Sequence, residues 1–275
     1  MNTRLNLPKS NIHSHTIFSD GRDSAEDMVR AALALGFHTL GFSEHGCADY
    51  DDSAMPACRE PEYRAEVLRL RNEYAGKIDL LLGCEHDWLS PPSRFEYDYT
   101  IESVHYVPKD GQLWCVDWSR EIFAGAVRTL YGGDVYALCR DYFRTVCESI
   151  EGTSADVLGH IELVMKFNEA RDLFDDADPR YLGPALACAE RAARSSRLVE
   201  INTGAIAKGY RTQPYPGPAM LKRVRECGGR VILSSDCHNR DYLDCGFAEA
   251  AELARACGFR TAWEYRGSGP VEYPL

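Results

Sequence analysis

The sequence lacks any apolar run long enough to cross a membrane. No stretch approaches the roughly 18 consecutive apolar residues that a spanning helix needs. Residues 1–10 are polar and lack the apolar core of a secretory signal peptide, so we expect a cytoplasmic protein made without an export signal. No low-complexity segment, fixed-period repeat or Gly/Ser-rich linker interrupts the 275 residues. This continuity predicts a single domain over 1–275.

Basic residues are in the minority, with 31 Lys and Arg against 42 Asp and Glu and a formal net charge of -11. Phosphate backbones and anionic membrane surfaces are bound mainly through clustered Lys and Arg. We therefore expect neither nucleic acid nor a membrane as the main partner, and a small molecule fits the composition better. The sequence does not predict an oligomeric state.

Cysteine pairs with the spacing of a structural zinc ribbon are absent, because no Cys-x-x-Cys occurs. The 11 cysteines are odd in number and scattered, which is a poor framework for disulfides. We interpret them as small apolar core residues in a reducing compartment.

Short apolar runs alternate with segments of helical periodicity along the whole chain. The predicted strands are 11–15, 39–45, 79–89, 99–107, 156–164, 198–206, 231–238 and 261–265. The predicted helices are 23–35, 62–74, 135–150, 179–193, 218–227 and 247–257. This alternation indicates βαβ units and a parallel sheet, and seven or eight units without a linker favour a closed barrel. The stretches 91–100 and 108–134 are predicted to be long loops over one face.

Six of the eight histidines lie at or just inside the C-terminal ends of the predicted strands, and three carboxylates lie in the same places. These nine residues are His13, His15, Asp20, His45, Glu85, His105, His160, Asp236 and His238. In a parallel barrel the C-terminal ends of all strands open onto one face, where catalytic residues gather. We therefore expect the nine side chains to converge there.

The pattern of these residues predicts a metal site. His13 and His15 are two residues apart on a strand and so point to the same side, and Asp236 and His238 repeat this spacing. Buried imidazoles and carboxylates need hydrogen-bond partners and compensating charge, and bound cations supply both. Nitrogen and oxygen donors without a thiolate suit zinc, iron or manganese. Nine ligands are too many for one ion, which indicates two or three metals.

In their order along the chain, these residues resemble the polymerase and histidinol phosphatase (PHP) superfamily of metal-dependent phosphoesterases. The resemblance covers about residues 10–240. Its motifs are Asn-Ile-His-Ser-His-Thr at 11–16, Ser-Asp-Gly at 19–21, Gly-Phe-Ser-Glu-His at 41–45, Gly-Cys-Glu at 83–85, Ser-Val-His at 103–105, Gly-His at 159–160 and Ser-Asp-Cys-His at 235–238. It implies a distorted (β/α)7 TIM-like barrel with the metal site at the C-terminal face of the strands.

Within the superfamily, the sequence is similar to the histidinol-phosphate phosphatases. The segments that carry this narrower likeness are 97–99, 103–107, 159–168, 200–204, 208–209 and 214–216. The likeness implies hydrolysis of L-histidinol phosphate to L-histidinol and phosphate, a step of histidine biosynthesis.

The family resemblance also implies how three metals would be shared. His13, His15, Glu85 and Asp236 would hold one metal, Glu85 would bridge to a second held by His105 and His160, and the third would take Asp20, His45 and His238. The expected nucleophile is a metal-bridging hydroxide held by Glu85 with His13, His15 and His105, which attacks phosphorus. No covalent nucleophile stands out by motif, and no residue is assigned to protonate the leaving alkoxide.

Further residues are expected around the substrate. Lys166, Lys208 and Arg211 follow predicted strands and are expected to bind the phosphate. The loop with Trp114, Asp117 and Trp118 could supply acidic and aromatic walls for the ammonium and imidazole groups.

Four other residues lie near the predicted ligands or resemble them. Ser43 and Glu44 flank His45 and are candidates to orient it. His38 is expected to be a surface or capping residue, and His86 should point away from the side of Glu85 by strand alternation.

Two alternatives remain open at this point. The same metal site could hydrolyse a nucleotide or another small phosphate ester. A chain of this kind could also serve as a non-catalytic metal-binding interaction module.

Overall fold

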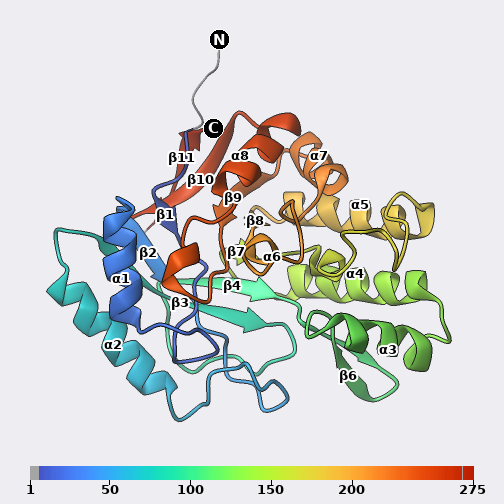
Figure 1. Ribbon diagram of the computed structural model, residues 1–275, viewed down its shortest axis with the longest axis horizontal. Helices are drawn as coiled ribbons and strands as arrows, with labels where there is room; N and C mark the ends of the chain where they lie inside the picture. Colours follow the sequence, from blue (N-terminus) through green and yellow to red (C-terminus); the bar gives the residue numbers. More distant parts are fainter. Residues whose placement is uncertain (1–5, 268) are drawn as a thin grey trace.

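Helices surround a strongly curled, mostly parallel sheet in the computed structural model of the chain (Figure 1). The structure describes residues 6–267 and 269–275. In these ranges the strands are β1 (Ser10–Asn11), β2 (Thr39–Phe42), β3 (Asp79–Asp87), β4 (Tyr99–Ser103), β5 (Tyr106–Lys109), β6 (Gln112–Cys115), β7 (Val157–Leu158), β8 (Leu198–Asn202), β9 (Arg230–Ser234), β10 (Thr261–Arg266) and β11 (Gly269–Pro274). The main sheet has the order β1-β2-β3-β4-β7-β8-β9-β10-β11. Among the described strands of this sheet, only β10 and β11 pair antiparallel.

The two ends of the parallel sheet meet, so that the strands close into a barrel. A parallel bridge joins Ser14, just after β1, to Cys237, just after β9. The backbone N–H of His15 donates to the carbonyl of Cys237 at 2.9 Å. Seven parallel strands of the described chain, β1 to β4 and β7 to β9, therefore surround one interior, while β10 and β11 extend the sheet beyond β9. The predicted distorted (β/α)7 architecture is confirmed.

The helices pack outside the strands (Figure 1). They are α1 (Ala25–Ala34), α2 (Glu60–Glu73), α3 (Arg120–Leu130), α4 (Val135–Gly152), α5 (Pro179–Arg194), α6 (Gly204–Ala207), α7 (Pro218–Glu226) and α8 (Phe247–Ala256). Side chains cap several N-termini, as where Ser24 accepts from the N–H of Asp27 at the start of α1. Among the described helices, none combines the length and apolar character needed to cross a membrane.

Tyr99 fills the barrel interior beneath the C-terminal end of the strands. Its ring is buried, and its hydroxyl donates to the carbonyls of Ile12 at 2.5 Å and Phe42 at 3.0 Å. A Cβ at Gly41 would lie 2.4 Å from the Tyr99 hydroxyl, and one at Gly83 would lie 2.2 Å from the ring. Glycine at these two positions is therefore what lets the large ring enter the barrel.

The segment 108–134 differs from the predicted long loop. Strand β6 pairs antiparallel with β5 to form a hairpin, and α3 follows it. Helix α3 is amphipathic and begins at Ser119, whose hydroxyl accepts from the N–H of Ile122, and it buries Phe123 and Ala126. The amphipathic pattern and the Ser119 cap are local signals of a helix, and packing of the apolar face against the core stabilises it here.

Candidate metal centre

The histidines and carboxylates that follow the strands come together at one end of the barrel. His13 and His15 follow β1, His45 follows β2, and Glu85 lies inside β3. The others are Asp20 in the loop after β1, His105 after β4, His160 after β7, and Asp236 and His238 after β9. All nine belong to overlapping groups in which one ligand atom of each residue lies within 4.8 Å of the others. The parallel order of the strands makes these distant residues neighbours.

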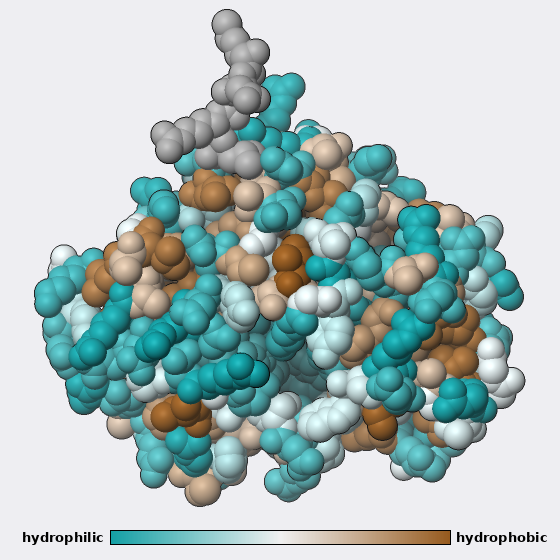
Figure 2. Space-filling model, viewed as in Figure 1, coloured by the Kyte–Doolittle hydropathy of each residue, from teal (hydrophilic) through white to brown (hydrophobic). Residues whose placement is uncertain are grey.

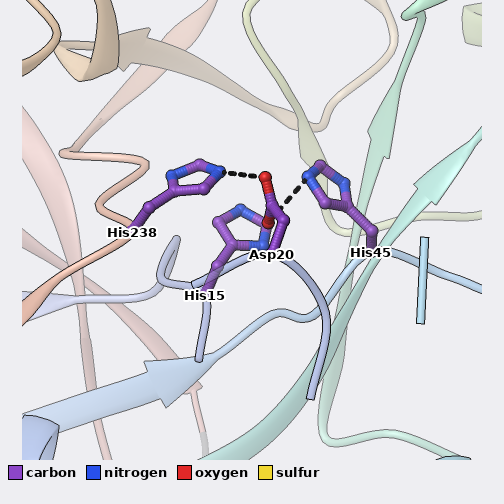
Figure 3. A group of neighbouring side chains, drawn as sticks. All are labelled: His15, Asp20, His45 and His238. Atoms are coloured by element: carbon purple, nitrogen blue, oxygen red, sulfur yellow. Dashed lines mark ion pairs between the residues drawn. The ribbon is translucent and has the colours of Figure 1, made fainter. Parts of the chain in front are cut away.

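One group consists of His15, Asp20, His45 and His238, whose side chains point toward one another (Figure 3). The Nε2 atom of His238 lies 3.0 Å from Asp20 Oδ2, and that of His45 lies 3.6 Å from Asp20 Oδ1. The His15 ring lies between the other two rings, with its centroid 4.3 Å from His45 and 4.4 Å from His238. Three imidazoles and one carboxylate thus surround a common space.

The carboxylate of Glu85 links the remaining groups. It is buried at the centre of the cluster, and its two oxygens face ring nitrogens on several strands. The partners are His13 Nε2 at 3.1 Å, His15 Nε2 at 3.4 Å, His45 Nδ1 at 3.0 Å, His105 Nε2 at 3.5 Å and His160 Nε2 at 2.8 Å. A carboxylate with both oxygens in such contacts can share two cations.

Asp236 approaches the cluster from the β9 side. Its Oδ1 atom lies 3.3 Å from His15 Nε2 and 3.6 Å from His13 Nε2. The residue has a left-handed backbone with φ 46°, which Asp tolerates better than most residues. A Cβ at Gly204 would lie 2.9 Å from Asp236 Oδ2, so glycine leaves room for this carboxylate.

Several buried atoms of the cluster find no hydrogen-bond partner among the described residues. They are His13 Nε2, both ring nitrogens of His15, His105 Nδ1, His160 Nδ1 and Glu85 Oε2. An unsatisfied buried polar atom costs about 1–3 kcal/mol, and metal ions beside Glu85 would satisfy His13 Nε2, His15 Nε2 and Glu85 Oε2 together. The donor atoms are nitrogen and oxygen, the set that divalent transition metals accept. The residues therefore fit the metal ions that the sequence predicted.

Burial and the crowding of carboxylates and imidazoles shift the pKa values of the cluster in both directions. Burial opposes ionisation of Glu85, but the neighbouring histidines, His13 first, hold the pKa of its carboxyl well below the usual range. Burial, together with His45 and His238, lowers the pKa of His15 to about 3. At pH 7 Glu85 is therefore an anion and His15 a neutral ring, as metal ligands need to be. Burial opposes protonation of His45 and His105, but the Glu85 carboxylate raises the pKa of His45 to about 9 and that of His105 to about 10. A metal ion that binds these two rings would therefore displace protons from them.

A cavity of about 240 Å³ opens over the cluster. Figure 2 shows that the face seen in Figure 1 is hollowed near its middle, between mainly hydrophilic residues. Six of the nine residues line the cavity, namely Asp20, His45, His105, His160, Asp236 and His238. His13, His15 and Glu85 are fully buried below them. A small molecule in the cavity would therefore lie directly against the cluster.

The three cations expected at the phosphate are placed differently. Among the described residues that line this cavity are Lys166 and Lys208 but not Arg211. The guanidinium of Arg211 instead donates to the carbonyl of Met165 at 2.8 Å and lines a neighbouring hollow. The cavity wall also includes Asp117 and Trp118 from the segment after β6, whereas Trp114 is absent from its described lining.

The two histidines outside the predicted ligand set lie outside the cluster. The Nε2 atom of His38 is 3.4 Å from Glu264 on β10. His86 lies on the other side of β3 from Glu85, with Nδ1 3.3 Å from Glu102 Oε2. The placement of His86 follows the alternation of side chains along β3.

Three buried carboxylates that the sequence did not predict as ligands contact the cluster from outside. Glu44 was a candidate to orient its neighbour His45, but its oxygens accept hydrogen bonds from Thr16 and Ser19 instead. Asp87 and Glu200 contact His105 and His13. Glu44 and Glu200 lie in segments that carry the family resemblance, and Asp87 is a charged residue at the end of an apolar strand, but none of these signals reveals the partner.

Comparison with known proteins agrees with this arrangement. The model of the PHP domain family matches residues 11–203. A Deinococcus radiodurans protein named a probable histidinol-phosphatase is 29% identical over 261 residues, which cover 90% of this chain and 94% of that protein. The histidinol-phosphatase of Lactococcus lactis is 26% identical over 284 residues, or 95% of this chain and 96% of the relative.

A solved structure has the same fold. The crystal structure of histidinol phosphate phosphatase from Lactococcus lactis, complexed with zinc, L-histidinol and phosphate, superimposes with a TM-score of 0.71 and 21% identity. The match covers 97% of this chain and 100% of that one.

Proposed function

The chain belongs to the PHP domain family as a metal-dependent phosphoesterase, and we propose that it hydrolyses L-histidinol phosphate to L-histidinol and phosphate. The observation that carries the proposal is the floor of the cavity. Nine imidazole and carboxylate side chains meet there in overlapping groups, and two lysines lie at its wall. Relatives with the proposed activity match about nine-tenths of the chain.

The residues divide the work of phosphate-ester hydrolysis. Metal ions bound by the cluster would supply a hydroxide for attack on phosphorus and neutralise the phosphate oxygens. Glu85, whose oxygens face ring nitrogens on several strands, would bridge neighbouring ions. Lys166 and Lys208 would hold phosphate oxygens above the cluster by charge-assisted hydrogen bonds. The burial of His13, His15 and Glu85 excludes water from the side of the cluster away from substrate.

The organic part of the substrate would lie against a different part of the wall. Asp51 and Ser53 from the loop after β2, Tyr106 at the start of β5 and Trp118 line the cavity together with the lysines. Among the described residues Asp51 forms no ion pair with a lysine or arginine, whereas Asp117 is paired with Lys166. Asp51 is therefore the carboxylate available to the ammonium or imidazole group of L-histidinol phosphate. A ring could stack on Trp118.

We assign two or three ions to the cluster, chosen among zinc, iron and manganese. Four residues each belong to two of the overlapping groups, namely Glu85, His13, His15 and His45. The cluster therefore offers fewer than four separate metal positions. The zinc in the Lactococcus lactis structure supports a transition metal at such a cluster. Availability decides among ions of this type, because nitrogen and oxygen sites accept several of them.

A panel of phosphate esters tests the proposal. Metal-loaded protein is assayed for phosphate release from L-histidinol phosphate, nucleoside monophosphates and phenyl phosphate, with metal content measured on the same sample. We expect the highest kcat/KM for L-histidinol phosphate. A clear preference for nucleoside monophosphates would replace the substrate assignment while keeping the phosphoesterase. Metal-loaded protein that turns over none of the esters would contradict catalysis altogether.

A further inference from the structure

Glu200 forms hydrogen bonds with two of the predicted ligands, His13 and His160. It is fully buried on β8, and its Oε1 atom lies 2.5 Å from His13 Nδ1. Its Oε2 atom accepts the backbone N–H of His160 at 2.7 Å. Asn202 and Ser234 donate to the same carboxylate. A hydrogen bond at Nδ1 fixes the His13 ring so that Nε2 faces Glu85, the direction in which a metal would lie.

Glu44 organises a different ligand. Its buried carboxylate accepts from the backbone N–H and hydroxyl of Thr16 at 2.9 and 2.6 Å. It also accepts from the N–H of Ser19 at 3.1 Å and from its hydroxyl at 2.5 Å. These four donors lie in the turn that leads into Asp20. Glu44 therefore holds the loop that presents the Asp20 carboxylate to His45 and His238.

Asp87 serves a third position. Its Oδ2 atom accepts the N–H of His105 at 2.8 Å and lies 3.4 Å from the Nδ1 atom of that ring. The hydroxyl of Tyr50, in the loop after β2, donates to its Oδ1 atom at 2.8 Å. This places His105 with Nε2 toward Glu85.

We propose that each part of the metal cluster has its own buried positioning carboxylate: Glu200 for His13 and His160, Glu44 for Asp20, and Asp87 for His105. None of the three is among the described residues that line the cavity, so they act through the ligands rather than on substrate. The inference rests on the metal-binding part of the proposed function and not on the identity of the substrate.

The chemistry of the contacts explains why a carboxylate is needed. Glu200 and Glu44 each face at least four donor groups, and carboxylate oxygens accept hydrogen bonds. An amide of the same shape would turn its NH2 group toward some of these donors and leave them unpaired. A Glu→Gln substitution therefore keeps the side-chain volume but breaks some of the hydrogen bonds that hold the ligands in position.

The three carboxylates should be separable, because they contact different ligand groups. Glu200 supports the group of His13, His160 and Asp236, whereas Glu44 supports the group that contains Asp20 and His238. Loss of one support should weaken one part of the cluster and leave the other able to bind metal.

Metal binding by matched variants tests this. Glu44→Gln and Glu200→Gln are compared with the wild type and with the control variant Glu102→Gln. Glu102 is a buried carboxylate on β4 that contacts Thr153 and His86 and no predicted ligand. Each protein is stripped, titrated with Co²⁺ and analysed for bound metal and for visible absorption. In Glu44→Gln and in Glu200→Gln, we expect one of the bound Co²⁺ ions to bind roughly 10- to 100-fold more weakly than in the wild type. The absorption spectra of the two should differ, because different ions remain, and Glu102→Gln should match the wild type.

Wild-type stoichiometry and affinity in both Glu44→Gln and Glu200→Gln would overturn the proposal. Equal losses in Glu102→Gln would do so too, because they would indicate general loosening of the sheet. Should Glu200→Gln fail to fold, Asp87→Asn supplies the same comparison, with weaker binding at the His105 position expected and unchanged binding contradicting the proposal. A wild type that binds metal but does not hydrolyse L-histidinol phosphate would refute the substrate assignment and leave this inference standing.

Discussion

The ammonium of Lys166 donates to the Asp117 carboxylate at 2.7 Å and to the Asp117 backbone carbonyl at 2.9 Å. Lys166 is almost completely buried, yet it lines the cavity above the metal cluster. Burial opposes its charge, but Asp117 raises the pKa of the ammonium, which therefore stays protonated at pH 7. A fixed cation is thus held at the edge of the space that the phosphate would enter.

Replacing this cation should impair catalysis without removing metal. We expect Lys166→Met to lower kcat/KM for L-histidinol phosphate roughly 10- to 100-fold, because a hydrogen bond to a charged group contributes about 1.5–3 kcal/mol. Metal content, measured on the same preparation, should remain at the wild-type level. Lys109→Met is the control, since Lys109 pairs with Asp141 and is not among the described residues lining the cavity. Equal activity of the two variants would contradict a role for Lys166 at the phosphate.

Asp51 should govern discrimination between cationic and uncharged substrates. Its Oδ1 atom accepts from the N–H and hydroxyl of Ser53 at 2.9 and 2.6 Å, which orients the carboxylate at the cavity wall. We expect Asp51→Asn to reduce kcat/KM for L-histidinol phosphate about tenfold and to leave phenyl phosphate nearly unaffected. The neighbouring Asp52 is exposed and lines a different groove, so Asp52→Asn is the matched control. A constant ratio between the two substrates in Asp51→Asn would argue against this assignment.

Removal of metal should abolish activity and lower thermal stability. Ions that bind only the folded chain stabilise it by about 2.7 kcal/mol at a free concentration 100 times Kd. We therefore expect a chelator to lower the melting temperature and added metal to restore both stability and turnover. His13→Ala should respond to added metal less than the wild type, because the two ligand groups that contain His13 are lost while the other two remain. His86→Ala should respond as the wild type does, because His86 faces Glu102 outside the cluster. Full metal response in His13→Ala would exclude this ring as a ligand.

Gly83 should be indispensable for the packing of Tyr99. A methyl group at position 83 would meet the Tyr99 ring at 2.2 Å, and the ring is enclosed in the barrel. We expect Gly83→Ala to reduce the free energy of unfolding by about 1–3 kcal/mol, measured by urea denaturation. Gly125→Ala in α3 has nothing within 4 Å of the new methyl group and should be neutral or slightly stabilising. Combining Gly83→Ala with Tyr99→Leu should recover part of the loss.

Much of the barrel could be predicted because its signals are local. Each parallel strand is an apolar run, and each of the six predicted helices has its own periodicity and end signals, as α4 shows between Asp134 and Thr153. The predicted strands were too long where the chain leaves the sheet toward the site, as in the run 11–15, of which only Asn11 lies in β1. Hairpin β5–β6 was missed because its apolar residue Trp114 is organised by packing against distant segments. Helix α3 has local signals of its own, an amphipathic pattern and the Ser119 cap, which the expectation of a long loop passed over.

In the candidate site, too, some features follow from the local sequence and others depend on the tertiary structure. The sequence by itself determined the donor set, since the two-residue spacing of His13 and His15 and the position of ligand residues at strand ends are properties of a local strand. Only the tertiary structure decided how those donors are grouped and which other carboxylates hold them. Glu200 and His13 are 187 residues apart and meet because the sheet closes. Glu44 is adjacent to a predicted ligand but contacts Thr16 and Ser19, because neighbouring side chains on extended backbone point to opposite sides.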